Sequence, residues 1–186
     1  MLYEKYSGNR LQKGKGDLGI WYVLYCPNHR EQDIIRSCRQ HLTGQALKDA
    51  FCFTYDRMRK YEGSWHVEQQ AMFPHYVFLE SEDKERLARE LRQYEEILTV
   101  LGGRDALVPV QREEEQFLRG LCGETHHSGM SKGYIRGGHT HVTEGPLRGK
   151  ERLIRRIDRH KRIARLELPG SLRNVNVGLE IYEKVR

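Results

Sequence analysis

The chain has 186 residues with 38% hydrophobic residues and a formal net charge of +6, which suits one domain or two small ones. Apolar runs fall short of the roughly 20 residues that a membrane helix needs, and the N-terminus lacks the pattern of a signal peptide. We therefore expect a cytoplasmic protein without membrane contact. The four cysteines have no Cys-x-x-Cys spacing, which is typical of buried thiols in a reducing compartment.

The first part of the chain predicts a compact α+β domain at 20–122. Residues 1–19 are polar and mixed in charge, so we expect a flexible extension. An aromatic and β-branched run at 21–26 predicts the first strand, and helical spacing of apolar residues predicts a helix at 30–42. The elements expected next are strands at 51–58, 65–72, 77–80 and 97–101, a helix at 83–94, and a last helix after Pro109.

The second part of the chain predicts a small all-β domain at 134–186. Residues 123–133 are rich in Gly, Ser, Thr and His, so we expect a linker there. Short strands are predicted at 140–143, 153–158, 163–168, 175–177 and 181–184. Five short strands joined by tight turns favour an SH3-like barrel.

Positive charge is concentrated in this second part. Residues 134–186 contain 13 Lys and Arg against 6 Asp and Glu, whereas the rest of the chain contains 19 against 20. Leu153, Ile157 and Ile163 are interspersed with the basic residues, so we expect a folded segment rather than a disordered basic tail. A fixed cationic surface suits nucleic-acid phosphates. The same charges would also suit a merely solvated face.

Neither a metal site nor an enzyme is expected. Cys122, His126 and His127 offer three ligands, but structural zinc sites usually take four at tighter spacing. His139 and His141 share one face of a predicted strand without a third ligand in the sequence, so we interpret them as surface or RNA-contacting side chains. Phosphate-binding loops, nucleophile elbows and His-Glu-x-x-His helices are missing from the sequence. We expect no cofactor.

Both parts of the chain resemble the NusG family of transcription elongation factors. The motifs similar to the N-terminal domain of that family are Trp21-Tyr22-Val23-Leu24, Phe73-Pro74-His75-Tyr76-Val77-Phe78, the Gly102-Gly103 stop and the helix after Pro109. The motifs similar to its C-terminal KOW barrel are Gly137-Gly138, Val142, Gly145-Pro146-Leu147-Arg148-Gly149, Ile154 and Ile157. The resemblance covers nearly everything after residue 19.

The resemblance extends to LoaP-type antiterminators, a specialised branch of the family that acts on long operons. The segments that carry it are Arg112-Glu113-Glu114-Glu115, Leu121-Cys122, Thr143-Glu144-Gly145-Pro146-Leu147, Ile157-Asp158-Arg159-His160-Lys161-Arg162 and Val177-Gly178-Leu179-Glu180-Ile181. Two departures stand out. His75 occupies a position where the family usually has glycine, and His139-Thr140 replaces acidic and aliphatic residues.

For the N-terminal domain, the resemblance implies a NusG-type α/β sandwich. It would bind the clamp helices of the large RNA polymerase subunit and hinder pausing and termination without catalysis. The matching positions for this contact are Trp21, Tyr22, Phe73, Pro74 and Tyr76. For Trp21 and Tyr22, core packing is an equally good interpretation. Contact with non-template DNA and a monomeric state are also implied.

For the KOW barrel, the resemblance implies recognition of an RNA hairpin in the nascent leader transcript. The residues expected to contact RNA are Arg148, Arg152, Arg155, Arg156, Arg159, His160, Lys161, Arg162 and Arg165. Guanidinium groups bind phosphates bidentately or stack on unpaired bases. Arg57, Arg59 and Lys60 are candidates to extend this surface.

An alternative within the same family stays open. A general elongation factor of the NusG type would use its KOW domain to contact the ribosome or a termination factor. Such a domain would not need so dense an arginine cluster.

Overall fold

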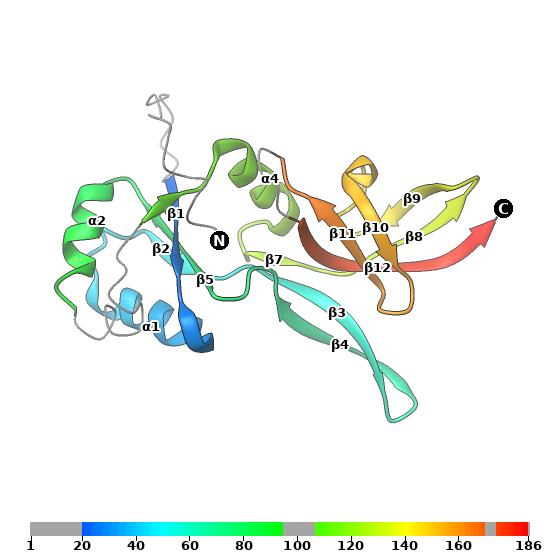
Figure 1. Cartoon of the computed structure of the whole chain (residues 1–186), viewed down its shortest axis with the longest axis horizontal. Coiled ribbons are helices and arrows are strands. Elements are labelled where there is room, and N and C mark those ends of the chain that lie inside the picture. The colour runs from blue at the N-terminus through cyan, green and yellow to red at the C-terminus, as the bar shows by residue number, and fades with distance from the viewer. Residues whose placement is uncertain (1–19, 95–106, 170–173, 186) are drawn as a thin grey trace. The chain divides into compact units, whose positions relative to one another are not determined.

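The structure, a computed structural model, describes residues 20–94, 107–169 and 174–185. The expected extension at 1–19 and the expected strand at 97–101 lie outside these residues. Within the described part of the chain, three α-helices accompany sheets of four, five and three strands, so the expected α+β class is confirmed (Figure 1). None of the helices described is both long and apolar enough to cross a membrane.

The chain divides into two compact units, with residues 52–74 grouped with the C-terminal part. The first unit consists of residues 1–51 and 75–110, and the second of residues 52–74 and 111–186. This division differs from the expected boundary near residue 122, because the hairpin that follows residue 52 packs against the C-terminal sheet.

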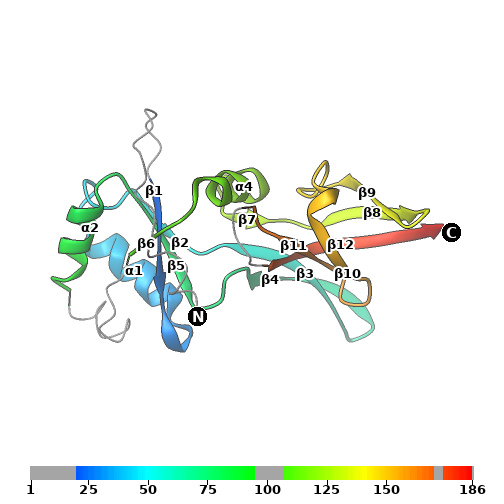
Figure 2. The same cartoon turned by 45° about the horizontal axis from the view of Figure 1, so that its top comes forward.

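The first unit is built on a four-stranded sheet with the order β2-β5-β1-β6. Its strands are β1 (Ile20–Tyr25), β2 (Asp49–Phe51), β5 (Tyr76–Ser81) and β6 (Val108–Pro109). β1 is central and pairs antiparallel with β5 from Ile20 opposite Ser81 to Tyr25 opposite Tyr76. In both views, α1 (Glu31–His41) and α2 (Lys84–Leu91) lie on one side of this sheet (Figures 1 and 2).

Helical spacing explains both helices of this unit. α1 follows the short 3₁₀ helix η2 (Pro27–His29) and buries Ile34, Ile35 and Cys38, which confirms the helix expected from their spacing. α2 buries Leu87 and Leu91, and Asp83 caps its N-terminus with a carboxylate that accepts a hydrogen bond of 2.9 Å from the Arg86 amide.

The second unit begins with a long hairpin. Its strands β3 (Thr54–Tyr61) and β4 (Ser64–Ala71) are joined by Glu62 and Gly63, both with positive φ, as the glycine in this polar turn predicted. β7 (His127–Ser128) pairs with β3 in parallel and completes a three-stranded sheet. The helix predicted after Pro109 is α4 (Arg112–Cys122).

The remaining strands form a five-stranded sheet with the order β10-β11-β12-β8-β9. Their bounds are β8 (Ser131–Arg136), β9 (His139–Glu144), β10 (Ile154–Asp158), β11 (Ile163–Glu167) and β12 (Asn174–Val185); the 3₁₀ helix η3 (Glu151–Leu153) precedes β10. Five strands were predicted as well, but β8 was not among them and two of the predicted strands form β12; closure into a KOW-type barrel stays a prediction.

Two details of this sheet differ from the expectation. The strands predicted at 175–177 and 181–184 are one strand, β12, whose register shift between Ile181 and Glu183 interrupts the alternation of side chains. β8 begins inside the segment expected to be a linker. Gly133 explains this error, because a Cβ there would collide with the carbonyl oxygen of His141 on β9. Gly133 allows β8 and β9 to approach each other closely, whereas the Gly- and Ser-rich residues before it suggest a loop.

Candidate functional site

The basic residues of the C-terminal segment project from β10, β11 and the turn between them. On β11, Arg165 is exposed between the buried Ala164 and Leu166. A register shift in β10 leaves both Arg155 and Arg156 exposed. The exposed side chains that we call the cationic face are Arg155, Arg156, Arg159, His160, Lys161 and Arg165. Two further predicted residues, Arg148 and Arg152, are exposed on the segment that leads into β10.

Two arginines of the cationic face are direct cross-strand neighbours. Arg156 on β10 pairs with Arg165 on β11, and Arg165 pairs with Asn176 on β12. Among the residues that the structure describes, neither arginine forms an ion pair. Like charges in this position destabilise a sheet. The pair therefore concentrates positive charge at a position where that charge does not stabilise the fold.

Two other cations of this face, Arg155 and Lys161, have carboxylate partners. Arg155 forms an ion pair with Glu167, and the Lys161 Nζ lies 4.0 Å from the Asp158 carboxylate. More than half of each of these two cationic side chains is exposed, at 58% and 61%. Exposed pairs of this kind contribute about 0–1 kcal/mol. A phosphate group can therefore replace these carboxylates at little cost.

The turn between β10 and β11 has a defined conformation. The Lys161 amide donates a hydrogen bond of 2.9 Å to Asp158 Oδ1. This bond is the main reason why the pKa of the Asp158 carboxyl is lowered. Arg162 has a positive φ of 52° and is followed directly by β11. The turn thus presents Arg159, His160 and Lys161 from an ordered backbone.

Arg162 differs from the other basic residues because its guanidinium is used internally. Its Cζ lies 3.8 Å from the ring centroid of Trp65. Its Nη1 lies 2.7 Å from Glu180 Oε1 and donates to Met58 Sδ at 3.1 Å. The expectation that Arg162 binds RNA together with its neighbours therefore needs revision. The structure assigns its side chain to the packing of the β3–β4 hairpin on the five-stranded sheet.

The β3–β4 hairpin adds aromatic and basic side chains to this unit. In both views it lies beside the β10–β11 turn (Figures 1 and 2). Arg59 and Lys60 are exposed on it, and Arg59 lies 3.8 Å from Glu68. Trp65 is 39% exposed, and Tyr61 is 44% exposed. Neither ring was among the predicted contact residues, although aromatic residues beside a polar turn with glycine were a signal in the sequence.

In the first unit, two of the predicted aromatic contacts are core residues. Trp21 is fully buried, packs edge-on against Phe51 at 5.3 Å and donates from Nε1 to Glu80 Oε2 at 3.1 Å. Tyr22 is also buried, and burial raises the pKa of its hydroxyl. Core packing, the alternative interpretation of both residues, accounts for these positions.

A partly exposed aromatic pair lies where the end of β1 is opposite the start of β5. Tyr25 on β1 is 40% exposed and lies opposite the half-buried Tyr76 on β5, with ring centroids 5.5 Å apart. Tyr76 was predicted, whereas Tyr25 was missed because it ends an otherwise buried run. Tyr25 and Tyr76 are called the tyrosine pair below.

The two remaining predicted contact residues, Phe73 and Pro74, belong to the second unit. Phe73 is buried, and its ring packs edge-on against Phe53 with the centroids 5.9 Å apart. Pro74 is exposed. Of these two residues, only Pro74 therefore offers a surface to a partner without rearrangement.

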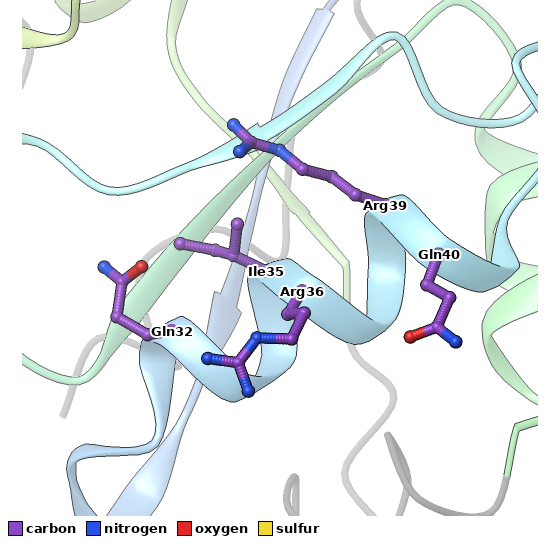
Figure 3. Close-up of a pocket in the computed structure, with 5 residues that line it drawn as sticks. All are labelled: Gln32, Ile35, Arg36, Arg39 and Gln40. Atoms are coloured by element: carbon purple, nitrogen blue, oxygen red, sulfur yellow. The ribbon is translucent and has the colours of Figure 1, made fainter.

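A hollow lies along the exposed face of α1. It is lined by Gln32, Ile35, Arg36, Arg39 and Gln40 (Figure 3). Arg36 lies 3.7 Å from Asp33, and Arg39 lies 3.0 Å from Asp49. Amide and guanidinium groups therefore dominate the hollow, and both cations have carboxylate partners.

An aromatic pair on one unit and a cationic face on the other suit a protein that binds macromolecules. Residues 19–119 match the family described as transcription termination factor NusG. Because the match covers more than half of the chain, the protein belongs to the NusG family. Members of this family are transcription factors that bind RNA polymerase. No curated protein matches the chain.

Proposed function

We propose that this protein is an antitermination factor of the LoaP type. It binds the clamp helices of RNA polymerase through its N-terminal part and a hairpin of the nascent leader RNA through the cationic face. Bound in this way, it promotes read-through of terminators in specific long operons. The observation that carries the proposal is the cross-strand pairing of Arg156 with Arg165.

The charge arrangement favours a polyanionic partner. Two adjacent arginines without a carboxylate partner among the described residues destabilise the isolated sheet, but bound phosphates would remove that penalty. The ordered turn adds Arg159, His160 and Lys161 beside them. A surface of this kind can contact both strands of a hairpin stem and set its register.

Exposed rings beside the cationic face favour RNA with unpaired bases. Loop and bulge bases are recognised by stacking on aromatic or guanidinium planes. Trp65 and Tyr61 are partly exposed on the hairpin that contacts Arg162. We therefore infer that phosphates of the stem bind the cationic face, while a loop base or a displaced non-template DNA base stacks on the hairpin.

Polymerase binding is proposed for the tyrosine pair of the first unit. Helix-in-groove contacts depend on a few aromatic anchors that become buried in the complex. Tyr25 and Tyr76 are accessible, whereas Trp21, Tyr22 and Phe73 are buried. Trp21 and Tyr22 belong to the core of the same unit and keep a structural role.

The alternative is a general elongation factor whose C-terminal part binds a ribosomal protein or a termination factor. One observation favours it: Tyr182 and Val185 are exposed on β12, at 56% and 37%, and Tyr182 lies 6.2 Å from the Tyr134 ring. Exposed apolar and aromatic side chains on a strand are typical of a protein-binding surface.

Transcription in vitro through a terminator distinguishes the two functions. Templates would encode the native leader hairpin or a scrambled leader of equal length upstream of the terminator. The proposal predicts that the protein raises read-through only with the native hairpin. The general factor predicts the same effect with both leaders, and this outcome would overturn the LoaP-type assignment.

A further inference from the structure

We propose that His29, Glu31 and His75 bind a divalent transition metal ion, with zinc as the expected ion. Among the described residues, these three form a group whose potential ligand atoms all lie within 4.8 Å of one another. His29 ends η2, Glu31 begins α1, and His75 directly precedes β5. All three belong to the first unit. The separation of 44 residues between Glu31 and His75 hides this cluster from motif reading.

The backbone around His75 is held in place from two directions. The His75 amide donates a hydrogen bond of 2.7 Å to Glu31 Oε1, and the Cys26 amide donates to the His75 carbonyl oxygen at 2.7 Å. The second carboxylate oxygen of Glu31 remains for a metal ion. The imidazole rings of His29 and His75 have centroids 4.2 Å apart and are tilted by 43° to one another. The ligands are therefore brought together before any ion binds.

One nitrogen of this cluster is buried without a hydrogen-bond partner in the described part of the chain. This nitrogen is Nδ1 of His75. A buried polar atom without a partner costs about 1–3 kcal/mol. A metal ion bound to Nδ1 of His75 would take the place of the missing hydrogen-bond partner and remove this cost.

The backbone conformation of His29 and His75 also supports a ligand role for their side chains. His29 and His75 have positive φ values of 54° and 71°, a region that favours glycine. A histidine at such a position costs on the order of 1 kcal/mol relative to glycine. His75 therefore lowers the stability of the fold at a position where glycine would be free of strain. A ligand role for the imidazole accounts for that choice.

The donor set defines the class of ion. Two imidazoles and one carboxylate match the three protein ligands of open zinc sites, whereas Mg²⁺ and Ca²⁺ prefer oxygen ligands. Tetrahedral zinc holds nitrogen ligands at about 2.0–2.1 Å, so the ligand atoms must approach one another to about 3.4 Å. Small rotations of the exposed His29 and of Glu31 would provide this closure.

Metal binding would connect two loops of the first unit. One loop joins β1 to α1 and carries His29, and the other leads into β5 and carries His75. The Tyr25 ring lies 6.2 Å from the His75 ring and also contacts Tyr76. An ion at this site would therefore fix the surroundings of the tyrosine pair, whatever that pair binds.

Calorimetric titration of the full chain with ZnCl₂ tests the site. The protein would carry no histidine tag and would first be treated with a chelator. We expect one equivalent of zinc to bind, and Mg²⁺ to give no binding heat under the same conditions. The absence of stoichiometric zinc binding would overturn the proposal.

Variants identify the ligands. His75→Gly, Glu31→Gln and His29→Asn should each weaken zinc binding by at least about tenfold. His75→Gly removes a ligand and relieves backbone strain at once, so the metal-free variant should unfold at the same or a higher temperature than the wild type. His139→Ala, at an exposed histidine of the second unit, is the matched control. Equal affinities of His75→Gly and His139→Ala would refute the assignment.

A Co²⁺ spectrum separates this site from thiolate sites. Histidine and carboxylate ligands give only ligand-field bands, whereas a cysteine ligand adds an intense charge-transfer band. The Cys26 amide donates a hydrogen bond to the His75 carbonyl oxygen, so a thiol lies near the cluster and this control is needed. A charge-transfer band that disappears in Cys26→Ser would assign the bound ion to a different ligand set.

Discussion

The guanidinium of Arg162 lies over the ring of Trp65, with 3.8 Å between Cζ and the ring centroid. The same guanidinium pairs with Glu180 on β12 at 2.7 Å. A single side chain thus joins the β3–β4 hairpin, the β10–β11 turn and the central strand of the five-stranded sheet. Gly178 reinforces this junction, because a Cβ there would collide with Met130 and with the Asp56 carbonyl on β3.

Replacing Arg162 should affect stability more than the other arginines of the turn do. Arg162→Ala removes a cation–π contact and leaves Glu180 without its partner, so we expect a loss of about 2 kcal/mol in the free energy of unfolding. Urea unfolding measures this value. Arg159→Ala is the matched control, because its side chain is exposed, and should change stability by less than about 0.5 kcal/mol. Equal effects of the two variants would contradict the internal role of Arg162.

Neutralising either arginine of the cross-strand pair should weaken RNA binding without lowering the stability of the fold. Arg156→Gln and Arg165→Gln remove like-charge repulsion, so each should leave stability unchanged or raise it by about 0.2–1 kcal/mol. Each should also weaken RNA binding and reduce the slope of log K against log salt by up to about 1. Arg36→Gln, with the same change of charge on α1, should leave RNA binding unchanged. Loss of stability in either pair variant would show that the pair serves the fold.

The tyrosine pair and the buried aromatic residues should behave differently in polymerase binding. Tyr76→Ala should reduce capture by an immobilised clamp-helix fragment by about tenfold if the ring contributes more than about 1 kcal/mol. Phe73→Ala should instead lower the free energy of unfolding by about 3–5 kcal/mol because Phe73 is buried. Circular dichroism of each variant identifies unfolded protein. Full capture by a folded Tyr76→Ala variant would refute the contact.

The buried thiols make stability sensitive to alkaline pH. Burial raises the pKa of the Cys38 and Cys122 thiols to about 12, from an ordinary value of 9.0. The unfolded chain therefore loses these protons at lower pH than the folded chain does. Their contribution is complete below pH 9 and declines between pH 9 and about pH 12, by up to about 1.4 kcal/mol per thiol and pH unit.

Urea unfolding at pH 8, 9 and 10 measures this decline, and thiol labelling at pH 8 checks the burial that causes the pKa shifts. The half-buried Cys52 should react first, while Cys38 and Cys122 should react only as fast as the chain unfolds. Cys38→Ser and Cys122→Ser assign the slow phases to their residues. Fast labelling of either buried thiol in the native protein would contradict its environment.

The periodicity of the sequence predicted most of the elements, because the pattern that indicates a helix or an exposed hairpin lies within a short stretch of residues. Apolar spacing located α1, and a polar turn with glycine located the β3–β4 hairpin. β8 was missed, because Gly133 is required by strand contact rather than by a turn. Local patterns also fail to distinguish a buried Trp21 from an accessible Tyr25, since both belong to the same apolar strand.

The candidate sites were predictable only in part for the same reason. The density of basic residues located the cationic face, but the opposition of Arg156 and Arg165 depends on a register that includes a bulge. Arg162 belongs to the basic run, yet its partners Met58, Trp65 and Glu180 lie on other strands. The His29, Glu31 and His75 cluster likewise requires the fold to bring distant segments together.

RNA recognition by the cationic face is measured by binding of the full chain to a leader RNA. Fluorescence anisotropy at physiological salt would compare the native hairpin with a scrambled hairpin of equal length and charge. We expect at least about tenfold tighter binding of the native hairpin, with loss of binding to both when Arg156, Arg159 and Arg165 are replaced together. Equal affinity for the two hairpins, or unchanged binding by the triple variant, would contradict recognition of the leader RNA by this face.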